Sequence, residues 1–273
     1  MNLPRLATLL FLTSAVVGGR LLPSAATTEQ IQGPLPSSAI ILDGEELVYE
    51  VSWTFFKIGT VRLRTSGDYS AVARIDSYDD LPFVDLHSVH YSWMDSSFFS
   101  RGSRSVELRE NAWWGLDYAY HLPERQLQVK EIYQTALDSP PQERGTIDTV
   151  MLADTNFVDG ISIAFFPRAR IHTNIPVSVP TVLYGKLGAT DFYFDGHKTT
   201  ESIEALDDPV RVVEVQGATS VVGVYGMTGA FTGWFSDDSA AVPIKGAVKV
   251  LLGDVEVEII QWKRDGWKPP TDR

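Results

Sequence analysis

Residues 248–259 read VKVLLGDVEVEI, and this stretch decides the fold class. After Gly253 and Asp254, aliphatic side chains alternate with charged ones (VEVEI), and aliphatic side chains also recur before this dipeptide (VKVLL). This pattern is typical of two antiparallel strands joined by a two-residue turn. A turn at these two residues places Val248 opposite Ile259, with the aliphatic side chains on a single face. The stretch therefore predicts a β-hairpin that buries one face.

The same period of two recurs along much of the chain. Residues 47–53 (LVYEVSW) and 61–64 (VRLR) alternate in this way across a short link that contains glycine, which is the pattern of an antiparallel hairpin. Further strand-like runs lie at 71–78, 87–94, 104–109, 115–121, 126–133, 210–215 and 228–235. This succession predicts an all-β domain with an antiparallel barrel-like or strongly curved sheet of about twelve strands.

Three local patterns interrupt the strands. Segment 157–166 has an apolar face and is followed by Pro167, which predicts one short helix that plugs an end or edge of the sheet. Asp195-Gly196 is typical of a tight hairpin turn, because both residues tolerate positive φ. The proline-rich stretch 138–145 (DSPPQERG) predicts a break between strands.

The N-terminus has the features of an export signal. Arg5 precedes an apolar run at 6–17, and small residues suit cleavage after Ala26. The run is too short to span a bilayer, which needs about 20 apolar residues, although a retained N-terminal anchor is the alternative. The predicted divisions are a signal peptide at 1–26, a flexible leader at 27–42, a single β-rich domain at 43–265 and a C-terminal tail at 266–273. We therefore expect a periplasmic or secreted protein with no stable membrane anchor after cleavage.

The amino-acid composition excludes some kinds of chemistry and makes some classes of partner unfavourable. The chain has no cysteine, which excludes disulfides, thiolate nucleophiles, cysteine-ligated zinc and a lipid-carrying cysteine. Its formal net charge of −12 disfavours nucleic acid and anionic lipid as partners. We expect no cofactor.

Asp237 and Asp238 are the most conspicuous candidate for acid–base chemistry. They lie between two serines in the link between two predicted strands, where aspartate and serine bond to nearby backbone amides. Catalytic carboxylate pairs need surroundings that drive their pKa values apart, usually by burial. The sequence therefore favours a turn at this pair over an acid–base site.

Ser162 is the centre of a sequence that resembles a nucleophile elbow (GISIA). That motif needs a sharp turn between a buried strand and a helix, whereas Ser162 falls inside the predicted helix. His87 and His90 are spaced so that an extended chain directs them to opposite faces, which argues against a shared metal ion. We therefore expect no catalytic residue and no metal site.

Trp113 and Trp114 are the best candidates for contact with a ligand. Adjacent side chains of a strand point to opposite faces, so one of the two rings is expected outside the main core. An exposed tryptophan can stack on a sugar or line an apolar cavity, and the alternative is packing between strands.

Several segments, in order, resemble a family of exported bacterial proteins, domain of unknown function 3108. They are GEELVYEVSWTFFKIGTVRL (44–63), YSWMDSSFF (91–99), VDGISIAFF (158–166) and the stretch 229–262 with its W-x-S-D-D motif. The resemblance implies a cell-envelope protein with a curved antiparallel sheet, similar to proteins encoded near surface-polysaccharide genes. It implies no catalytic residues, and residues 206–209 depart from the family's usual turn.

These observations predict a non-catalytic exported protein of the cell envelope. It would bind an apolar or glycan ligand or assist the assembly of the envelope or of surface polysaccharide. Its partner would be a lipid, a glycan or an envelope protein. The alternatives are a periplasmic hydrolase and a purely structural partner in an envelope complex.

Overall fold

The structure is a computed structural model that describes residues 34–79, 81, 85–121, 123–151, 156–183, 185–221, 229–250 and 253–271. The expected signal peptide at 1–26 lies outside these residues. Among the described helices, none has the length and apolar character needed to cross a membrane.

The described residues form two helices of four residues each and fifteen strands. They are α1 (Ser37–Ile40), β1 (Glu46–Trp53), β2 (Phe56–Ser66), β3 (Ser70–Ser77), β4 (His87–Met94), β5 (Ser100–Arg109), β6 (Ala112–His121), β7 (Gln126–Gln134), β8 (Gln142–Met151), α2 (Ser162–Phe165), β9 (Val177–Leu183), β10 (Lys186–Tyr193), β11 (Lys198–Glu201), β12 (Val210–Thr219), β13 (Gly229–Ser236), β14 (Pro243–Val250) and β15 (Gly253–Lys263).

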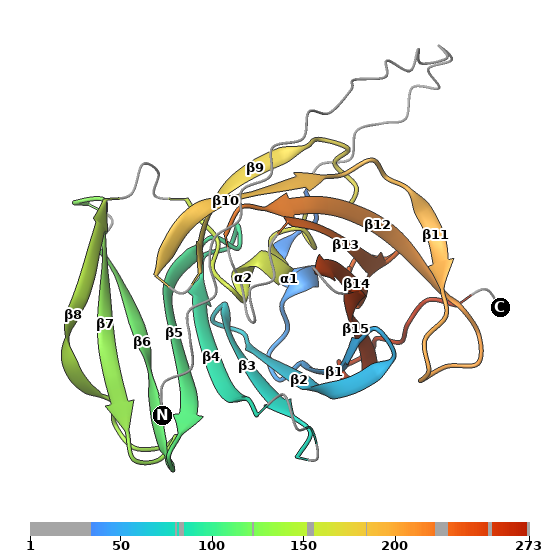
Figure 1. The fold of residues 1–273 in the computed structure, drawn as a ribbon. Coiled ribbons are helices and arrows are strands. Elements are labelled where there is room, and N and C mark those ends of the chain that lie inside the picture. The colour runs from blue at the N-terminus through green and yellow to red at the C-terminus, as the bar shows by residue number, and fades with distance from the viewer. Residues whose placement is uncertain are drawn as a thin grey trace, which may run out of the picture. The chain divides into compact units, whose positions relative to one another are not determined.

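All of these strands belong to one antiparallel sheet. Its order is β8-β7-β6-β5-β4-β3-β2-β1-β15-β14-β13-β12-β10-β9, and β11 also pairs with β12. The sheet curves round α1 and α2, while β6, β7 and β8 continue beyond the curve (Figure 1). The expected strongly curved all-β sheet is confirmed, with fifteen strands in the described part of the chain rather than about twelve.

β8 explains part of the difference in strand number. It begins inside the segment 138–145, where the prolines predict a break. Nine of its ten residues are exposed, including Ile147 and Met151, and the other is only half-buried. A strand at the edge of a sheet with both faces in solvent has no alternating burial, so the sequence carries no period of two to reveal it.

The last hairpin forms with a different register. Val248 lies opposite Val255, not Ile259, and Val250 pairs with Gly253, so the chain reverses before Gly253. A Cβ atom on Gly253 would lie 2.5 Å from Thr54 Oγ1, so this glycine serves the close approach of β15 to the β1–β2 turn. The partner of Val248 changes by four residues, an even number, which keeps the same side chains on the same face. Ile259 is accordingly fully buried.

Asp195-Gly196 does not form a hairpin. β10 and β11 both pair with β12, at residues 216–219 and 210–213 respectively, so the chain continues in one direction past this dipeptide. Gly196 has a φ of +69°, and a Cβ atom there would lie 2.7 Å from Asn174 Oδ1. The positive φ expected of Asp-Gly therefore belongs to an interruption between β10 and β11, which both pair with β12, and not to a reversal of the chain.

The predicted helix at 157–166 is mostly not helical. Phe157 O accepts a hydrogen bond from the amide of Ser100 on β5, and Val158 bonds through its own amide and carbonyl to β9. These two residues thus bridge β5 and β9, and only Ser162–Phe165 forms α2. The backbone groups of Phe157 and Val158 that bond to these strands are therefore not available for hydrogen bonds within a longer helix.

Both ends of the predicted domain extend further than expected. Ile40 of α1 and Ile41 are buried, and the amide of Leu35 donates to Ala169 O, so this part of the expected leader 27–42 packs with the domain. In the expected tail 266–273, Pro270 O accepts a hydrogen bond from the amide of Arg211. The packed domain therefore runs beyond the predicted limits 43–265.

Side chains fill the interior of the curve. The largest buried cluster draws on α1, α2 and most of the strands; its fully buried members include Ile40, Leu47, Phe98, Phe165, Ile244 and Ile259. A second cluster, around Phe157, packs β6 and β7 against β9.

One ion cluster lies inside this core. Glu45 is fully buried between two guanidiniums, with 3.2 Å from its Oε1 to Arg168 Nη1 and a direct contact from Oε2 to Arg264. Arg168 also donates to Ala240 O at 3.0 Å, and Arg264 donates to Ile40 O at 3.1 Å. The cluster thus joins α1, the start of β1, the segment after α2, the β13–β14 loop and the end of β15.

Candidate functional site

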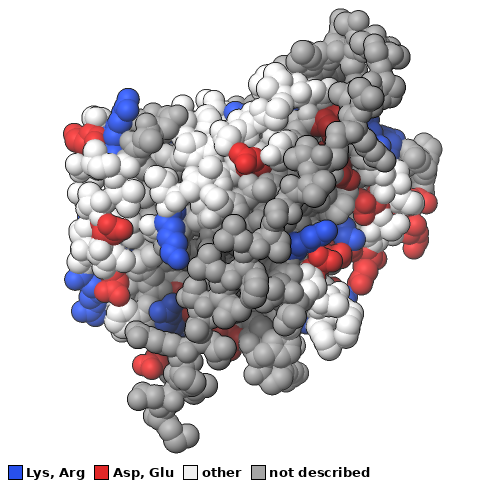
Figure 2. Space-filling view, turned by 45° about the horizontal axis from the view of Figure 1, so that its top comes forward, with Lys and Arg blue, Asp and Glu red and all other residues white. Residues whose placement is uncertain are grey.

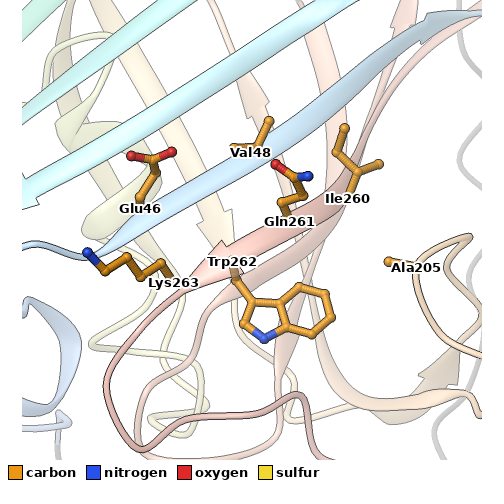
Figure 3. Close-up of a pocket in the computed structure, with 7 residues that line it drawn as sticks. All are labelled: Glu46, Val48, Ala205, Ile260, Gln261, Trp262 and Lys263. Atoms are coloured by element: carbon orange, nitrogen blue, oxygen red, sulfur yellow. The ribbon is translucent and has the colours of Figure 1, made fainter.

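A groove opens on β1 and β15, next to the segment between β11 and β12. Its volume is about 430 Å³. It is lined by Glu46, Val48, Ala205, Ile260, Gln261, Trp262 and Lys263 (Figure 3). The size lies within the range of small-ligand sites, and the lining combines apolar groups with a few polar ones, as such sites do.

A β-bulge shapes the groove. Val48 pairs with Gln261 and Tyr49 with Ile259, so Ile260 is an extra residue on β15 without a direct partner. A bulge bends its strand and redirects the neighbouring side chains, and bulges are frequent next to functional sites. Here the bulge directs Ile260 and Gln261 to the same side, whereas Trp262 lies opposite Leu47, whose side chain is in the core (Figure 3).

Residues 202–209 form the opposite wall through Ala205. Ile203 is buried, the amide of Glu204 donates to Glu258 Oε1 at 2.7 Å, and the Glu204 carboxylate accepts from Lys57 at 2.8 Å. The hydrogen bonds hold the wall in place beside β15.

Trp262 is the one aromatic residue among those that line the groove; it is half-buried and also packs against the main core cluster. Its ring packs edge-to-face on Trp267 with centroids 6.1 Å apart, and Trp267 Nε1 donates to Asp238 at 2.8 Å. A tryptophan held by its neighbours loses little conformational entropy when a ligand stacks on it. Sequence reasoning missed Trp262, because its place beside a bulge cannot be read from alternation alone.

Charged side chains flank the other end of the groove. Glu46 accepts a hydrogen bond from Arg64 Nε at 2.5 Å and another from Arg62, and Lys263 makes no ion pair with the described residues. Burial raises the pKa of the Glu46 carboxyl, but Arg64 and Arg62 lower it by more, so the net shift is downward. Glu46 is therefore a carboxylate at neutral pH.

The two tryptophans predicted to contact a ligand point to opposite faces. Trp113 is buried in a small cluster with Val89, Val106 and Ile132. Trp114 is half-buried against Tyr133, with ring centroids 4.7 Å apart, and the Arg144 guanidinium lies over both rings. Neither ring lines the groove at Trp262, and their contact with a ligand stays a prediction.

Asp238 organises the turn expected at the aspartate pair. Its Oδ1 accepts from Ser236 Oγ, Ala240 N and Ala241 N, and its Oδ2 accepts from Trp267 Nε1. Asp237 instead pairs with Lys198 at 3.1 Å on another side of the turn. The preference for a turn at this pair therefore agrees with the structure.

Ser162 is buried, and its hydroxyl accepts a hydrogen bond from the Asp159 amide at 2.7 Å. The Asp159 carboxylate in turn accepts from Ser92 Oγ, Ser100 Oγ, Ile161 N and Ser162 N. These reciprocal bonds form a cap at the start of α2. Because the hydroxyl already serves the cap, this geometry gives no support to Ser162 as a nucleophile.

The histidines do not converge. His87 pairs with Asp76 at 2.9 Å, whereas His90 lies beside Ser88 at 3.1 Å. Burial lowers the pKa of His90 to about 4, although the Glu107 charge opposes this shift. Within the described residues, no group of three His, Asp or Glu side chains could hold a metal ion.

Comparison with known proteins defines the fold and leaves the activity open. No family model matches the chain, and no curated protein matches it. Among solved structures, it is similar to a β-barrel-like protein of domain of unknown function DUF1849 from Brucella abortus, with a TM-score of 0.54 and 10% sequence identity. The match covers 82% of this chain and 98% of that chain. The chain therefore has the fold of a β-barrel-like domain of unknown function.

Proposed function

We propose that this protein is an exported, non-catalytic component of the cell envelope that binds a carbohydrate in the groove at Trp262. The observation that carries the proposal is the lining: one preoriented tryptophan beside Gln261, Glu46 and Lys263. Sugar rings present C–H faces that stack on an aromatic ring and hydroxyls that bond to amide, carboxylate and ammonium groups. The export features of the N-terminus support placing this groove outside the cytoplasm.

A glycan fits this surface better than the apolar ligand that we also considered. The described interior of the curve holds a large cluster of buried apolar side chains, whereas the groove is open at the surface. Three of the seven lining residues there are charged or carry an amide on the strands themselves, Glu46, Gln261 and Lys263. An alkyl chain would desolvate these groups without replacing their hydrogen bonds.

The test is to screen the mature protein against an array of neutral and acidic bacterial oligosaccharides. We expect at least one class to bind, and expect Trp262→Ala to weaken that binding about tenfold through lost stacking. Trp93→Ala is the matched control, because Trp93 is a partly exposed tryptophan on β4 outside the groove. Gln261→Ala, at an exposed position, tests the same site without touching the core.

Two outcomes would refute the proposal. If no carbohydrate binds above background, the ligand assignment is wrong. If mass spectrometry finds shortened products after incubation with a bound oligosaccharide, the protein is not a passive binder. Crosslinking in cells, followed by identification of a stoichiometric protein partner without any glycan, would favour the purely structural alternative.

We also propose that the chain belongs to the domain-of-unknown-function 3108 proteins that it resembles. Segment 44–63, which carries part of the resemblance, contains Ile58-Gly59, and the glycine has a physical reason: a Cβ atom on Gly59 would lie 2.3 Å from Asp76 O on β3. Membership predicts that a solved structure of an accepted member pairs the equivalent glycine with the same neighbouring strand. A member whose glycine lies in an open loop would count against the assignment.

A further inference from the structure

The charges round the groove are not distributed evenly. Arg62, Arg64 and Lys263 contribute three positive charges near a single negative one, Glu46, which gives a local sum of +2. The whole chain has a formal net charge of −12. On the face seen in Figure 2, basic and acidic side chains lie close together rather than in one large field. A net positive cluster beside a groove is therefore a local feature of this surface.

The three cations retain unused hydrogen-bond donors. Glu46 accepts one bond from Arg62 Nη1 and one from Arg64 Nε. A guanidinium carries five N–H donors in a planar fork, so each arginine keeps donors that Glu46 does not engage. The side chains of Arg62 and Arg64 are 43% and 64% exposed, and Lys263 is exposed too. These donors can reach a ligand.

The opposite wall of the groove has the reverse character. Ala205 follows Glu204, whose amide bonds to Glu258, and Glu258 lies near Lys245 together with Glu201 and Glu256. Burial is the largest cause that raises the pKa of Glu201; the Lys245 charge opposes it, and nearby carboxylates add to the rise. Like charges across an interface are costly, so a ligand charged along its whole length is disfavoured at this wall.

We infer that the groove binds an acidic glycan, with a carboxylate-bearing sugar at the end near Arg62, Arg64 and Lys263 and a neutral sugar stacked on Trp262. This inference rests on the proposed function and names its ligand class. A sugar carboxylate accepts two parallel hydrogen bonds from a guanidinium fork, a geometry that a neutral hydroxymethyl group cannot reproduce. The acidic wall at Ala205 sets the direction in which the glycan lies.

The experiment compares oligosaccharides that contain uronic acids with neutral ones of the same length, by titration calorimetry with the full mature chain. Galacturonate and galactose oligosaccharides form one pair, because they differ at C6 in a carboxylate against a hydroxymethyl group. We expect the acidic member to bind about tenfold tighter at about 0.15 M salt, and expect the difference to shrink at about 1 M salt.

Three variants locate the effect. Arg62→Gln with Arg64→Gln should weaken binding of the acidic oligosaccharide about tenfold and leave the neutral one within about twofold. Lys263→Gln, at an exposed position without an ion pair among the described residues, should cost about threefold and is the variant least able to disturb folding. Arg109→Gln is the control, because Arg109 is an exposed arginine on β5 paired with Glu107.

Each remaining outcome decides against the inference. Equal binding of acidic and neutral oligosaccharides, or no effect of the arginine variants, overturns it while the proposed function stands. Binding of neutral oligosaccharides alone does the same. If no carbohydrate binds, both the acidic-glycan inference and the proposed carbohydrate-binding function are wrong. Single-stranded DNA that binds as tightly as the acidic oligosaccharide would show a general anion site instead of a glycan site.

Discussion

Glu45 and Glu46 are consecutive residues, and each of them forms ion pairs with two arginines. The Glu45 cluster lies inside the curved sheet, and the Glu46 cluster lies outside it. Glu45 faces the core, where Arg168 and Arg264 hold it without contact with solvent. Glu46 faces the groove at the other side of the chain, because successive side chains of a strand alternate between faces. One carboxylate with two guanidiniums therefore occurs twice, once buried in the core and once exposed to solvent.

The difference between these clusters lies in what water can do. In the buried cluster every unpaired charge would remain desolvated, so the loss of one partner is costly although the intact cluster adds little net stability. In the exposed cluster solvent compensates a missing partner, so the pair is worth little to folding. The inner cluster is suited to fixing the ends of the fold, and the outer one can exchange partners with a ligand.

The largest effect should come from Glu45→Gln. It leaves two buried guanidiniums without a carboxylate, and we expect a loss of about 3–5 kcal/mol in the free energy of unfolding, measured by urea denaturation. Glu46→Gln makes the identical chemical change one residue later and should cost less than about 1 kcal/mol. Similar losses in the two variants would show that burial does not separate the clusters.

Asp159 sharpens the comparison, because it is a buried carboxylate satisfied entirely by neutral donors. Asp159→Ala removes the acceptor for two serine hydroxyls and two backbone amides, and should destabilise the fold by about 2–3 kcal/mol. Asp159→Asn keeps one acceptor oxygen for the amides and should cost less. If the alanine variant matches wild type in urea denaturation, the cap on α2 does not stabilise the fold.

The sequence predicts the strands whose two faces differ in environment. β4 begins and ends at the predicted residues, 87 and 94, because His87 to Met94 lie between two other strands. The sequence does not predict β8, because both faces of this strand are in solvent. The prediction of a helix at 157–166 is mostly wrong, because Phe157 and Val158 form hydrogen bonds with strands distant in sequence. Such long-range backbone pairing leaves no local signal in composition or period.

The candidate site shows the same division. Glu46 and Val48 belong to an alternating strand whose outward face can be read directly from the sequence. The groove, however, depends on the bulge at Ile260 and on Ala205, which is distant in sequence. The sequence points to Trp113 and Trp114 as candidate ligand contacts because they are adjacent in one strand. The position of Trp262 at the groove instead depends on the pairing between β1 and β15. A site made by the ends of a chain has no contiguous motif.

His90 extends the comparison to a half-buried group that can gain a charge. Its folded pKa of about 4 lies below the ordinary 6.5, so the unfolded chain binds a proton between these values and the folded chain does not. Stability should therefore fall as pH drops from about 6.5 to about 4, by up to about 3 kcal/mol from this residue. His90→Gln should flatten that part of the pH profile relative to wild type, and parallel profiles would contradict the assignment.

Glu46 should give the smallest effect and the one most sensitive to salt. Its folded pKa is lowered, so its contribution is present above the ordinary value of 4.5 and is lost as pH falls through the folded value. Because its arginines are exposed, Glu46→Gln should cost only a few tenths of a kcal/mol at pH 7, and the cost should disappear in about 1 M salt. Wild type and variant should approach each other as pH falls below 4.5 and converge only below the lowered folded pKa, since protonated Glu46 resembles glutamine. A cost that persists in high salt would mean that the outer cluster shares the dry environment of the inner one, and its arginines would then be poor candidates for exchange with a ligand.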